Sequence, residues 1–267
     1  MSRPMSRVAI EIADHIAEVC LNRPEKKNAL DPQFFADLAE AGDSLHDRDD
    51  LRAVVMYGAG NCFCAGIDTS GFGAMAADME KTRHDMRNPA PGARGNRFQR
   101  PTLAFQEIPV PVIAAIEGVA FGGGIQIALA ADIRFATPDA KLSIMETRWG
   151  IIPDMGITQY LPQLMRADQA KDLIMTARIV GAEEALSLGL VTRVCDNPLE
   201  EARAYARALT LRNPEAIRAT KTLVDETWTA GDAALELEGE LQAQIIGGAN
   251  QMEAVMAEMQ KREPKFS

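Results

Sequence analysis

Two glycine-bearing loops hold the residue types best suited to chemistry in this chain. The first is FCAGID, residues 63–68, and the second is Gly122-Gly123-Gly124, which opens the apolar stretch IQIALAAD. Each loop follows a strand-like run, and the second leads into a helical pattern. Glycine lets a ligand approach the backbone closely, and the first N–H groups of a helix are unpaired. Together the loops can aim two N–H groups at one carbonyl oxygen and stabilise an oxyanion formed from it.

The second glycine loop allows two other interpretations. A phosphate also suits the N-terminus of a helix. However, the chain lacks both the G-x-G-x-x-G fingerprint of dinucleotide sites and a following Lys-Ser/Thr pair. A simple tight turn is the remaining alternative, and the loop taken alone does not exclude it.

Two carboxylates, Glu146 and Asp154, flank the mostly apolar residues 149–153. Partial burial raises the pKa of a carboxyl group and suits it to proton transfer near neutral pH. These residues are therefore candidates for a catalytic base and its proton-transfer partner. The alternative is a solvated acidic loop, or an ion pair with Arg148.

Gln126 is the third candidate, because it lies three residues after Gly123. On a helix this spacing places both residues on one face, near the same ligand. A glutamine amide can orient water or a carbonyl group, but it cannot act as a base at neutral pH.

The cysteines and histidines do not form a metal-binding pattern. The chain has four cysteines and three histidines: Cys20, Cys62, Cys64, Cys195, His15, His46 and His84. The histidines are scattered, and four cysteines are too few for a disulfide scaffold of this size. We expect packing or surface roles for all seven residues and no bound metal.

The composition excludes several classes of function. The formal net charge of -10 argues against a nucleic-acid partner, whose phosphates require a basic surface. No apolar run is long enough to span a membrane, and the first residues, MSRPMSR, lack the apolar segment of a signal peptide. We expect a cytoplasmic protein without a membrane partner.

Hydrophobic periodicity predicts alternating strands and helices. A hairpin is expected over 8–12 and 16–21, then a helix capped by Asp31 whose inner face carries Phe34, Phe35, Leu38, Ala41 and Leu45. Further strands are expected at 53–57, 109–116, 133–136 and 142–144, with helices from Gly122, at 158–177, 183–188 and 199–211, and two long helices within 214–261. This alternation indicates an α/β fold.

The sequence also predicts one domain boundary and one segment of distinct composition. Residues 1–200 are expected to form a core that carries the site, and residues 201–267 a helical C-terminal region. Residues 71–100 are rich in Gly, Met and Arg. They are either a lid or acyl-pocket wall, or a plain surface insertion.

Four segments in order resemble the crotonase superfamily, also called the enoyl-CoA hydratase/isomerase family. They are NRPEKKNAL (22–30), GAGNCFCAGID (58–68), EGVAFGGGIQIALAADIRFA (117–136) and KLSIMETRWGIIPDMG (141–156). The resemblance implies a crotonase-like spiral of strand-strand-helix turns. It also implies C-terminal helices that mediate a homotrimer, with trimers pairing into hexamers in many relatives.

The resemblance further implies an acyl-CoA thioester ligand, with coenzyme A as part of the substrate and no separate cofactor. The thioester oxygen would be held by the N–H groups of Ala65 and Gly123. The implied CoA contacts are Glu25, Lys27, Ala29, Ala65, Gly66, Ile67, Asp68 and Gly122, with Lys261 or Lys265 meeting CoA phosphates.

The chain departs from the family's best-known members at two positions. Hydratases carry a second glutamate where this chain has Gln126, and commonly a glycine where it has Asp154. Dienoyl-CoA isomerases have an acid at the latter position but also an aspartate at the former. Glu146 matches both, so the pattern is a hybrid.

This hybrid pattern slightly favours double-bond isomerisation, with Glu146 as base, Asp154 returning a proton and Gln126 orienting substrate or water. Enoyl-CoA hydration is the first alternative, with Glu146 and Asp154 sharing one water. A catalytically weak acyl-CoA-binding homologue is the second alternative. Other oxyanion chemistries, such as thioester hydrolysis or decarboxylation, also stay open.

Overall fold

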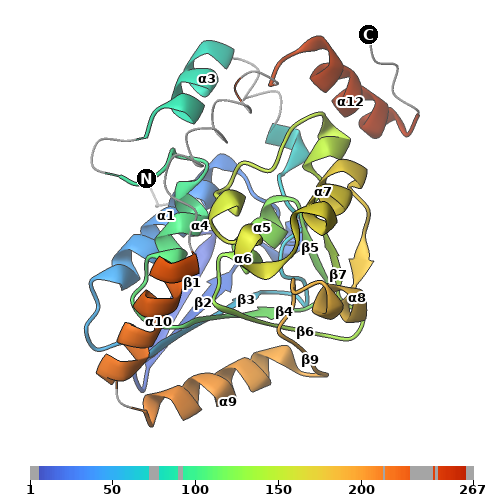
Figure 1. Ribbon diagram of the computed structural model, residues 1–267. Helices are drawn as coiled ribbons and strands as arrows, with labels where there is room; N and C mark the ends of the chain where they lie inside the picture. Colours follow the sequence, from blue (N-terminus) through green and yellow to red (C-terminus); the bar gives the residue numbers. More distant parts are fainter. Residues whose placement is uncertain are drawn as a thin grey trace.

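The protein is a two-sheet α/β fold, seen here in a computed structural model that describes residues 6–71, 78–89, 93–212, 214–228, 243 and 246–262 (Figure 1). The larger sheet has six strands in the spatial order β1 (Val8–Ala13), β2 (Ile16–Leu21), β3 (Ala53–Gly58), β4 (Val112–Ile116), β6 (Ile133–Ala136) and β9 (Arg193–Val194). Strands β1 and β2 are antiparallel, and every later pair in this sheet is parallel. The smaller sheet contains β5 (Val119–Phe121), β7 (Lys141–Ser143) and β8 (Val180–Gly181).

Helices cover both sheets. The α-helices of the described residues are α1 (Pro32–His46), α3 (Met79–Arg87), α4 (Arg100–Gln106), α5 (Gly123–Leu129), α6 (Leu161–Leu164), α7 (Ala167–Thr176), α8 (Ala182–Ser187), α9 (Pro198–Thr210), α10 (Pro214–Trp228) and α12 (Ala249–Gln260). Short 3-10 turns lie at η1 (Pro24–Lys26), η2 (Thr69–Gly71), η3 (Glu146–Trp149) and η4 (Ile157–Gln159). None of these helices is long and apolar enough to cross a membrane.

The first helix begins where the sequence predicts. The Asp31 carboxylate accepts a hydrogen bond of 2.8 Å from the Phe34 N–H, and Pro32 occupies the first helical turn. Phe34 and Leu38 are fully buried beneath the helix. Phe35, predicted on the same inner face, is instead half-buried and lines a cavity.

Both faces of the large sheet are buried at its central strands β3 and β4, which explains their continuous apolar sequences. Val54 and Met56 of β3 point into the main core with Phe34 and Leu38. Val55 points to the other face, where α9 packs, as seen beneath the sheet in Figure 1. The boundary predicted after residue 200 therefore falls inside α9, a helix that belongs to the core.

Two expectations differ from the structure. The helix predicted over 158–177 is broken into η4, α6 and α7, because Met165 is extended with φ -150° and ψ 167°. The strand predicted at 109–116 begins at Val112, and the short strands β5, β8 and β9 were not predicted. Residues 71–100 contain α3, whereas 72–77 and 90–92 lie outside the described residues.

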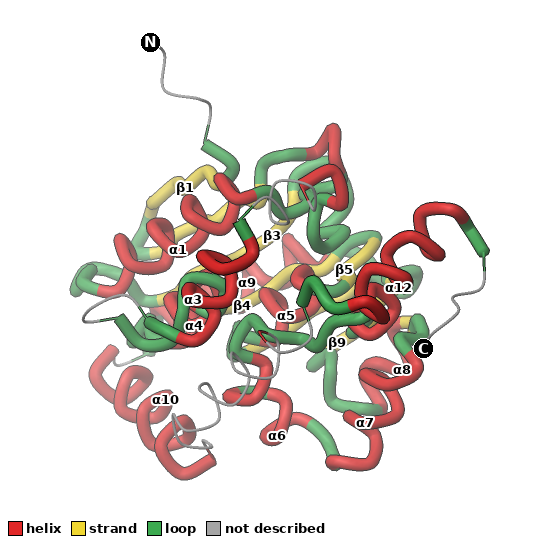
Figure 2. The backbone as a smooth tube through the Cα atoms, turned by 90° about the horizontal axis from the view of Figure 1, so that it is seen from above, coloured by secondary structure: helices red, strands yellow, loops and turns green. Residues whose placement is uncertain are grey.

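The C-terminal helices attach to the core through polar side chains. In α10 the Lys221 ammonium pairs with Asp132 at 2.8 Å. In α12, Gln251 donates to the Trp149 carbonyl at 3.2 Å, and Glu258 pairs with Arg148. Helices α3 and α12 lie at the same end of the molecule in Figure 1, and the view from above shows that they stand apart there (Figure 2).

Candidate active site

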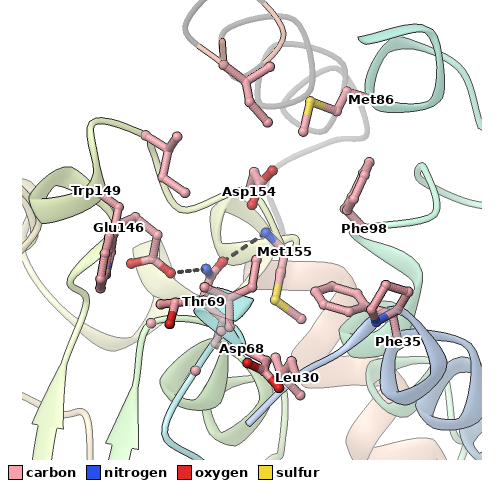
Figure 3. Close-up of a pocket in the computed structure, with 18 of the residues that line it drawn as sticks. Leu30, Phe35, Asp68, Thr69, Met86, Phe98, Glu146, Trp149, Asp154 and Met155 are labelled. Atoms are coloured by element: carbon pink, nitrogen blue, oxygen red, sulfur yellow. Dashed lines mark hydrogen bonds between the residues drawn. The ribbon is translucent and has the colours of Figure 1, made fainter. Parts of the chain in front are cut away.

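The two glycine loops meet at one cavity of about 810 Å³ (Figure 3). Of the residues predicted for the site, the cavity is lined by Ala65, Gly66, Ile67, Asp68, Gly122, Gly123, Gln126, Glu146 and Asp154. It is not lined by Glu25, Lys27 or Ala29. The first two of these are exposed on the neighbouring turn, and Ala29 is half-buried there.

Gly123 is the first residue of α5 and lines the cavity. The N–H groups of a first helical turn have no partner within the helix, and the helix dipole adds a partial positive charge there. The preceding Gly122 has φ +52°, and its N–H donates to Ser143 at 2.9 Å. The run is therefore more than a tight turn, because it starts a helix that points at a cavity.

Gly124 brings the two loops into backbone contact. A Cβ at this position would lie 2.3 Å from the Cys64 carbonyl oxygen, so only glycine fits. Burial raises the pKa of the Cys64 thiol to about 12, so it remains protonated and is no nucleophile. The first loop accordingly contributes backbone groups.

Hydrogen bonding in the first loop shows that the predicted oxyanion donor, Ala65, was wrong. The Ala65 N–H already donates to the Lys27 carbonyl at 2.9 Å, so it is not directed at a ligand. Two residues further along, Ile67 forms a parallel β-bridge with Leu30. In this bridge the Leu30 N–H donates to the Gly66 carbonyl, and the Asp68 N–H donates to the Leu30 carbonyl. In such a bridge the N–H of the central residue points away from the partner segment.

The N–H of Ile67 therefore points toward the side on which β5 lies. The position of β5 is fixed by the bridge between Cys64 and Ala120, and β5 runs directly into Gly122 and Gly123. Ile67 and Gly123 are thus the pair of cavity-lining residues whose N–H groups suit an oxyanion. Sequence reasoning had assigned Ile67 a CoA contact only.

Glu146 is held by Gln126. The Glu146 carboxylate is buried, with 6% of the residue exposed, and its Oε1 accepts a hydrogen bond of 2.6 Å from Gln126 Nε2. Gln126 is buried as well, and its Oε1 accepts from the Met155 N–H at 2.9 Å. Both ends of this amide form hydrogen bonds within the protein, so Gln126 orients the Glu146 carboxylate. The sequence had instead predicted that Gln126 orients substrate or water.

Glu146 and Asp154 face the same cavity. A Cβ at Gly122 would lie 3.5 Å from Glu146 Oε1, which places this carboxylate beside the oxyanion loop. Asp154 is half-buried and precedes Met155, the residue that anchors Gln126 (Figure 3). Arg148, the ion-pair partner considered in the sequence, pairs with Glu258.

The ion pair between Arg23 and Asp68, which was not predicted from the sequence, fixes the first loop. Arg23 Nη1 bonds the Asp68 carboxylate at 2.7 Å and the Ala29 carbonyl at 2.9 Å. Hydrogen bonds from the Ser70 hydroxyl and from Arg23 lower the pKa of Asp68 to about 2. Residues 23–30 and 65–68 are thereby joined, and Ile67 lies within the joined segment.

Comparison with known proteins agrees with this geometry. The sequence profile described as enoyl-CoA hydratase/isomerase matches residues 11–267. The chain belongs to the enoyl-CoA hydratase/isomerase family. Within the described residues, no group of three or more His, Cys, Asp or Glu side chains is placed to hold a metal ion.

Relatives in this family include both reaction types. A mitochondrial Delta(3,5)-Delta(2,4)-dienoyl-CoA isomerase of Mus musculus is 34% identical over 259 residues, which span 94% of this chain and 78% of that protein. A mitochondrial methylglutaconyl-CoA hydratase of Mus musculus is 32% identical over 254 residues, spanning 92% and 77%. The crystal structure of an enoyl-CoA hydratase/isomerase from Pseudoalteromonas atlantica T6c is similar with a TM-score of 0.82 at 28% identity, covering 98% of this chain and 100% of that one.

Proposed function

We propose that this enzyme isomerises a double bond in an enoyl-CoA thioester. The observation that carries the proposal is the Gln126 amide, which bonds Glu146 at one end and the Met155 N–H at the other. Gln126 leaves a single carboxylate, Glu146, beside the oxyanion loop. Proton transfer needs one base at that point, whereas hydration by two adjacent glutamates needs a second carboxylate to hold water.

The reaction proceeds by two proton transfers, one from C2 of the acyl chain and one to C4. Glu146 takes a proton from C2 of a 3-enoyl-CoA, and the electron pair delocalises onto the thioester oxygen. The N–H groups of Ile67 and Gly123 stabilise that oxyanion, a contribution of about 3 kcal/mol to the barrier per donor. A proton held on Asp154 then goes to C4, which leaves the double bond between C2 and C3. Exchange with water then removes the proton from Glu146 and returns one to Asp154.

Hydration is the second candidate, and a specific observation favours it. Glu146 and Asp154 line one cavity, so both carboxylates have access to a common water. The similarity to the methylglutaconyl-CoA hydratase also supports this alternative. A catalytically weak acyl-CoA-binding homologue would instead bind CoA thioesters without turning them over.

The coenzyme A portion is proposed to leave the cavity past Asp68 toward Glu25, Lys27 and Ala29. These three residues lie outside the cavity but on the turn that Arg23 joins to Asp68. Lys261 ends α12 and is a further candidate for the CoA phosphates, whereas Lys265 lies outside the described residues. Coenzyme A would enter as part of the substrate.

Two further predictions extend the proposal. A homotrimer, or a hexamer of paired trimers, is expected from the family resemblance and is measured by light scattering at micromolar concentration. A cytoplasmic location is expected from the sequence and is tested by fractionating the source cells.

The experiment incubates purified protein with 2-enoyl-, 3-enoyl- and 3,5-dienoyl-CoA of short and medium length, separates the products by liquid chromatography and determines their masses. The proposal expects 3-enoyl-CoA to give 2-enoyl-CoA, or the dienoyl-CoA to give a product with shifted double bonds, in each case with unchanged mass. A gain of one water from 2-enoyl-CoA would favour hydration. Tight binding without any product would favour the binding homologue.

A further inference from the structure

One wall of the cavity is apolar and lies away from the reacting carboxylate. We call it the acyl wall and define it as Phe35, Met79, Met86, Phe98 and Ile246, all of which line the cavity. Figure 3 shows Phe35, Phe98 and Met86 across the cavity from Glu146, with Asp154 between them. An acyl chain whose thioester sits at the oxyanion loop can therefore extend past Asp154 to this wall.

The acyl wall is held by its own packing. The rings of Phe35 and Phe98 meet edge to face with centroids 6.2 Å apart. Met86 and Ile246 are buried, and Met79 and Phe98 pack against them. Because aromatic pairs and thioethers both favour contact with another apolar group or ring, this wall suits a bulky apolar end.

Both arginines that line the cavity already have acidic partners. Arg97 pairs with Asp85 at 3.2 Å, and its guanidinium lies over the Phe98 ring, 4.6 Å from the centroid. Arg100 pairs with Glu107 at 2.5 Å and also with Asp43. The described lining contains no lysine or histidine, but it does contain three carboxylates, Asp68, Glu146 and Asp154.

We propose that the enzyme selects acyl groups that are uncharged, apolar and at least as large as a phenyl ring. This inference rests on the proposed acyl-CoA function and adds the class of acyl group. An apolar end displaces water from Phe35 and Phe98 and gains the free energy of burial. A terminal carboxylate would lose hydration beside arginines that are already paired and near three other carboxylates.

Calorimetric titration with unreactive, saturated thioesters tests the inference without requiring turnover. The probes are 4-phenylbutanoyl-CoA, adipoyl-CoA, which ends in a carboxylate, butanoyl-CoA and free CoA. We expect 4-phenylbutanoyl-CoA to bind about 30-fold more tightly than butanoyl-CoA. Adipoyl-CoA should bind no more tightly than butanoyl-CoA.

Matched variants locate the effect at the acyl wall. Phe98→Ala should weaken 4-phenylbutanoyl-CoA binding about tenfold and leave butanoyl-CoA binding unchanged, and Phe98→Leu should restore most of the loss. Met175→Ala is the control, because Met175 is 71% exposed on α7 and does not line the cavity. Circular dichroism shows whether each variant folds. If Phe98→Ala does not fold, the inference is tested by the binding of the four probes to wild type and by the Phe98→Leu variant.

The outcomes separate this inference from the proposed function. Equal binding of all three thioesters, tighter than free CoA, would keep the acyl-CoA function and overturn the acyl-group selectivity. Tightest binding of adipoyl-CoA would also overturn it. Absence of binding by every thioester and by CoA would overturn both proposals.

Discussion

The side-chain amide of Gln126 donates to Glu146 Oε1 across 2.6 Å, and both residues are buried. The same amide accepts from the N–H of Met155, which directly follows Asp154. One side chain therefore fixes the proposed base and contacts the segment that carries the second carboxylate. In the proposed mechanism, the relative position of the two proton-transfer groups depends on a residue that exchanges no proton itself.

Replacing Gln126 by methionine should lower kcat about 10- to 100-fold and change KM little. The variant keeps the side-chain volume but removes the hydrogen bond to a carboxylate, a bond of about 1.5–3 kcal/mol. Steady-state kinetics with the best enoyl-CoA substrate measures kcat and KM separately. An unchanged kcat in a folded variant would show that Glu146 does not need this bond.

Replacing Gln126 by glutamate should change the type of reaction. Two carboxylates at hydrogen-bonding distance share a proton and titrate as a coupled pair. We expect isomerisation to fall and hydration of 2-enoyl-CoA to rise relative to it, because a second carboxylate then faces the cavity. The ratio of the two products, measured by mass spectrometry, checks this, and an unaltered ratio would contradict it.

Adjacent glycines should respond differently to alanine. At Gly123 a Cβ meets the side-chain ends of Leu30 and Met155 at 2.7 and 2.8 Å, so Gly123→Ala should fold and keep its N–H, but should lose about 100-fold in kcat/KM because the methyl group displaces that N–H from the oxyanion. At Gly124 the Cβ meets the Cys64 backbone, so Gly124→Ala should lower the free energy of unfolding by about 3 kcal/mol.

Gly181 supplies the control for both alanine variants. A Cβ there has no atom within 4 Å, so Gly181→Ala should change neither activity nor stability. Thermal unfolding and kinetics on the three proteins make the comparison. Full activity in Gly123→Ala would argue against an oxyanion hole at this helix start.

The pH dependence of stability should reveal the Arg23–Asp68 pair. Hydrogen bonds from Ser70 and Arg23 lower the pKa of Asp68 from 3.8 to about 2, so the ionised form is favoured in the folded state. That stabilisation is present above pH 4 and is lost as the pH falls toward 2. Asp68→Asn should therefore lower the free energy of unfolding by about 1 kcal/mol at pH 7, allowing for solvent screening, and by less at pH 3.

Urea unfolding of both proteins at several pH values measures this difference. Asp50→Asn provides an exposed comparison, because the ion pair of Asp50 with Arg48 lies on the surface. A gap between wild type and Asp68→Asn that stays constant from pH 7 to pH 3 would contradict the assignment.

Local sequence patterns predicted the elements that depend on local physics. The hairpin of β1 and β2 and the Asp31 cap of α1 are confirmed, because alternation and capping act within a few residues. Strands β8 and β9 have two residues each and exist only through pairing with distant strands. Such elements leave no periodic pattern to detect.

The site was predicted in composition but not in backbone direction. The β-bridge between Ile67 and Leu30 determines which N–H of residues 63–68 faces the cavity. Because of this bridge the candidate oxyanion donor is Ile67, whereas Ala65 was predicted. The role of Gln126 likewise depends on Glu146, twenty positions further along the chain. In both cases a non-local hydrogen bond determined the outcome.

The most direct test of the central claim is the conversion of a 3-enoyl-CoA in deuterium oxide by wild type, Glu146→Gln and Asp154→Asn. We predict that wild type forms the 2-enoyl-CoA with deuterium at C4. Glu146→Gln should lose about 10²–10⁴-fold in rate while still binding 4-phenylbutanoyl-CoA. Asp154→Asn should slow the incorporation of deuterium at C4. Wild-type turnover by Glu146→Gln, or a hydrated product as the main species, would contradict the claim.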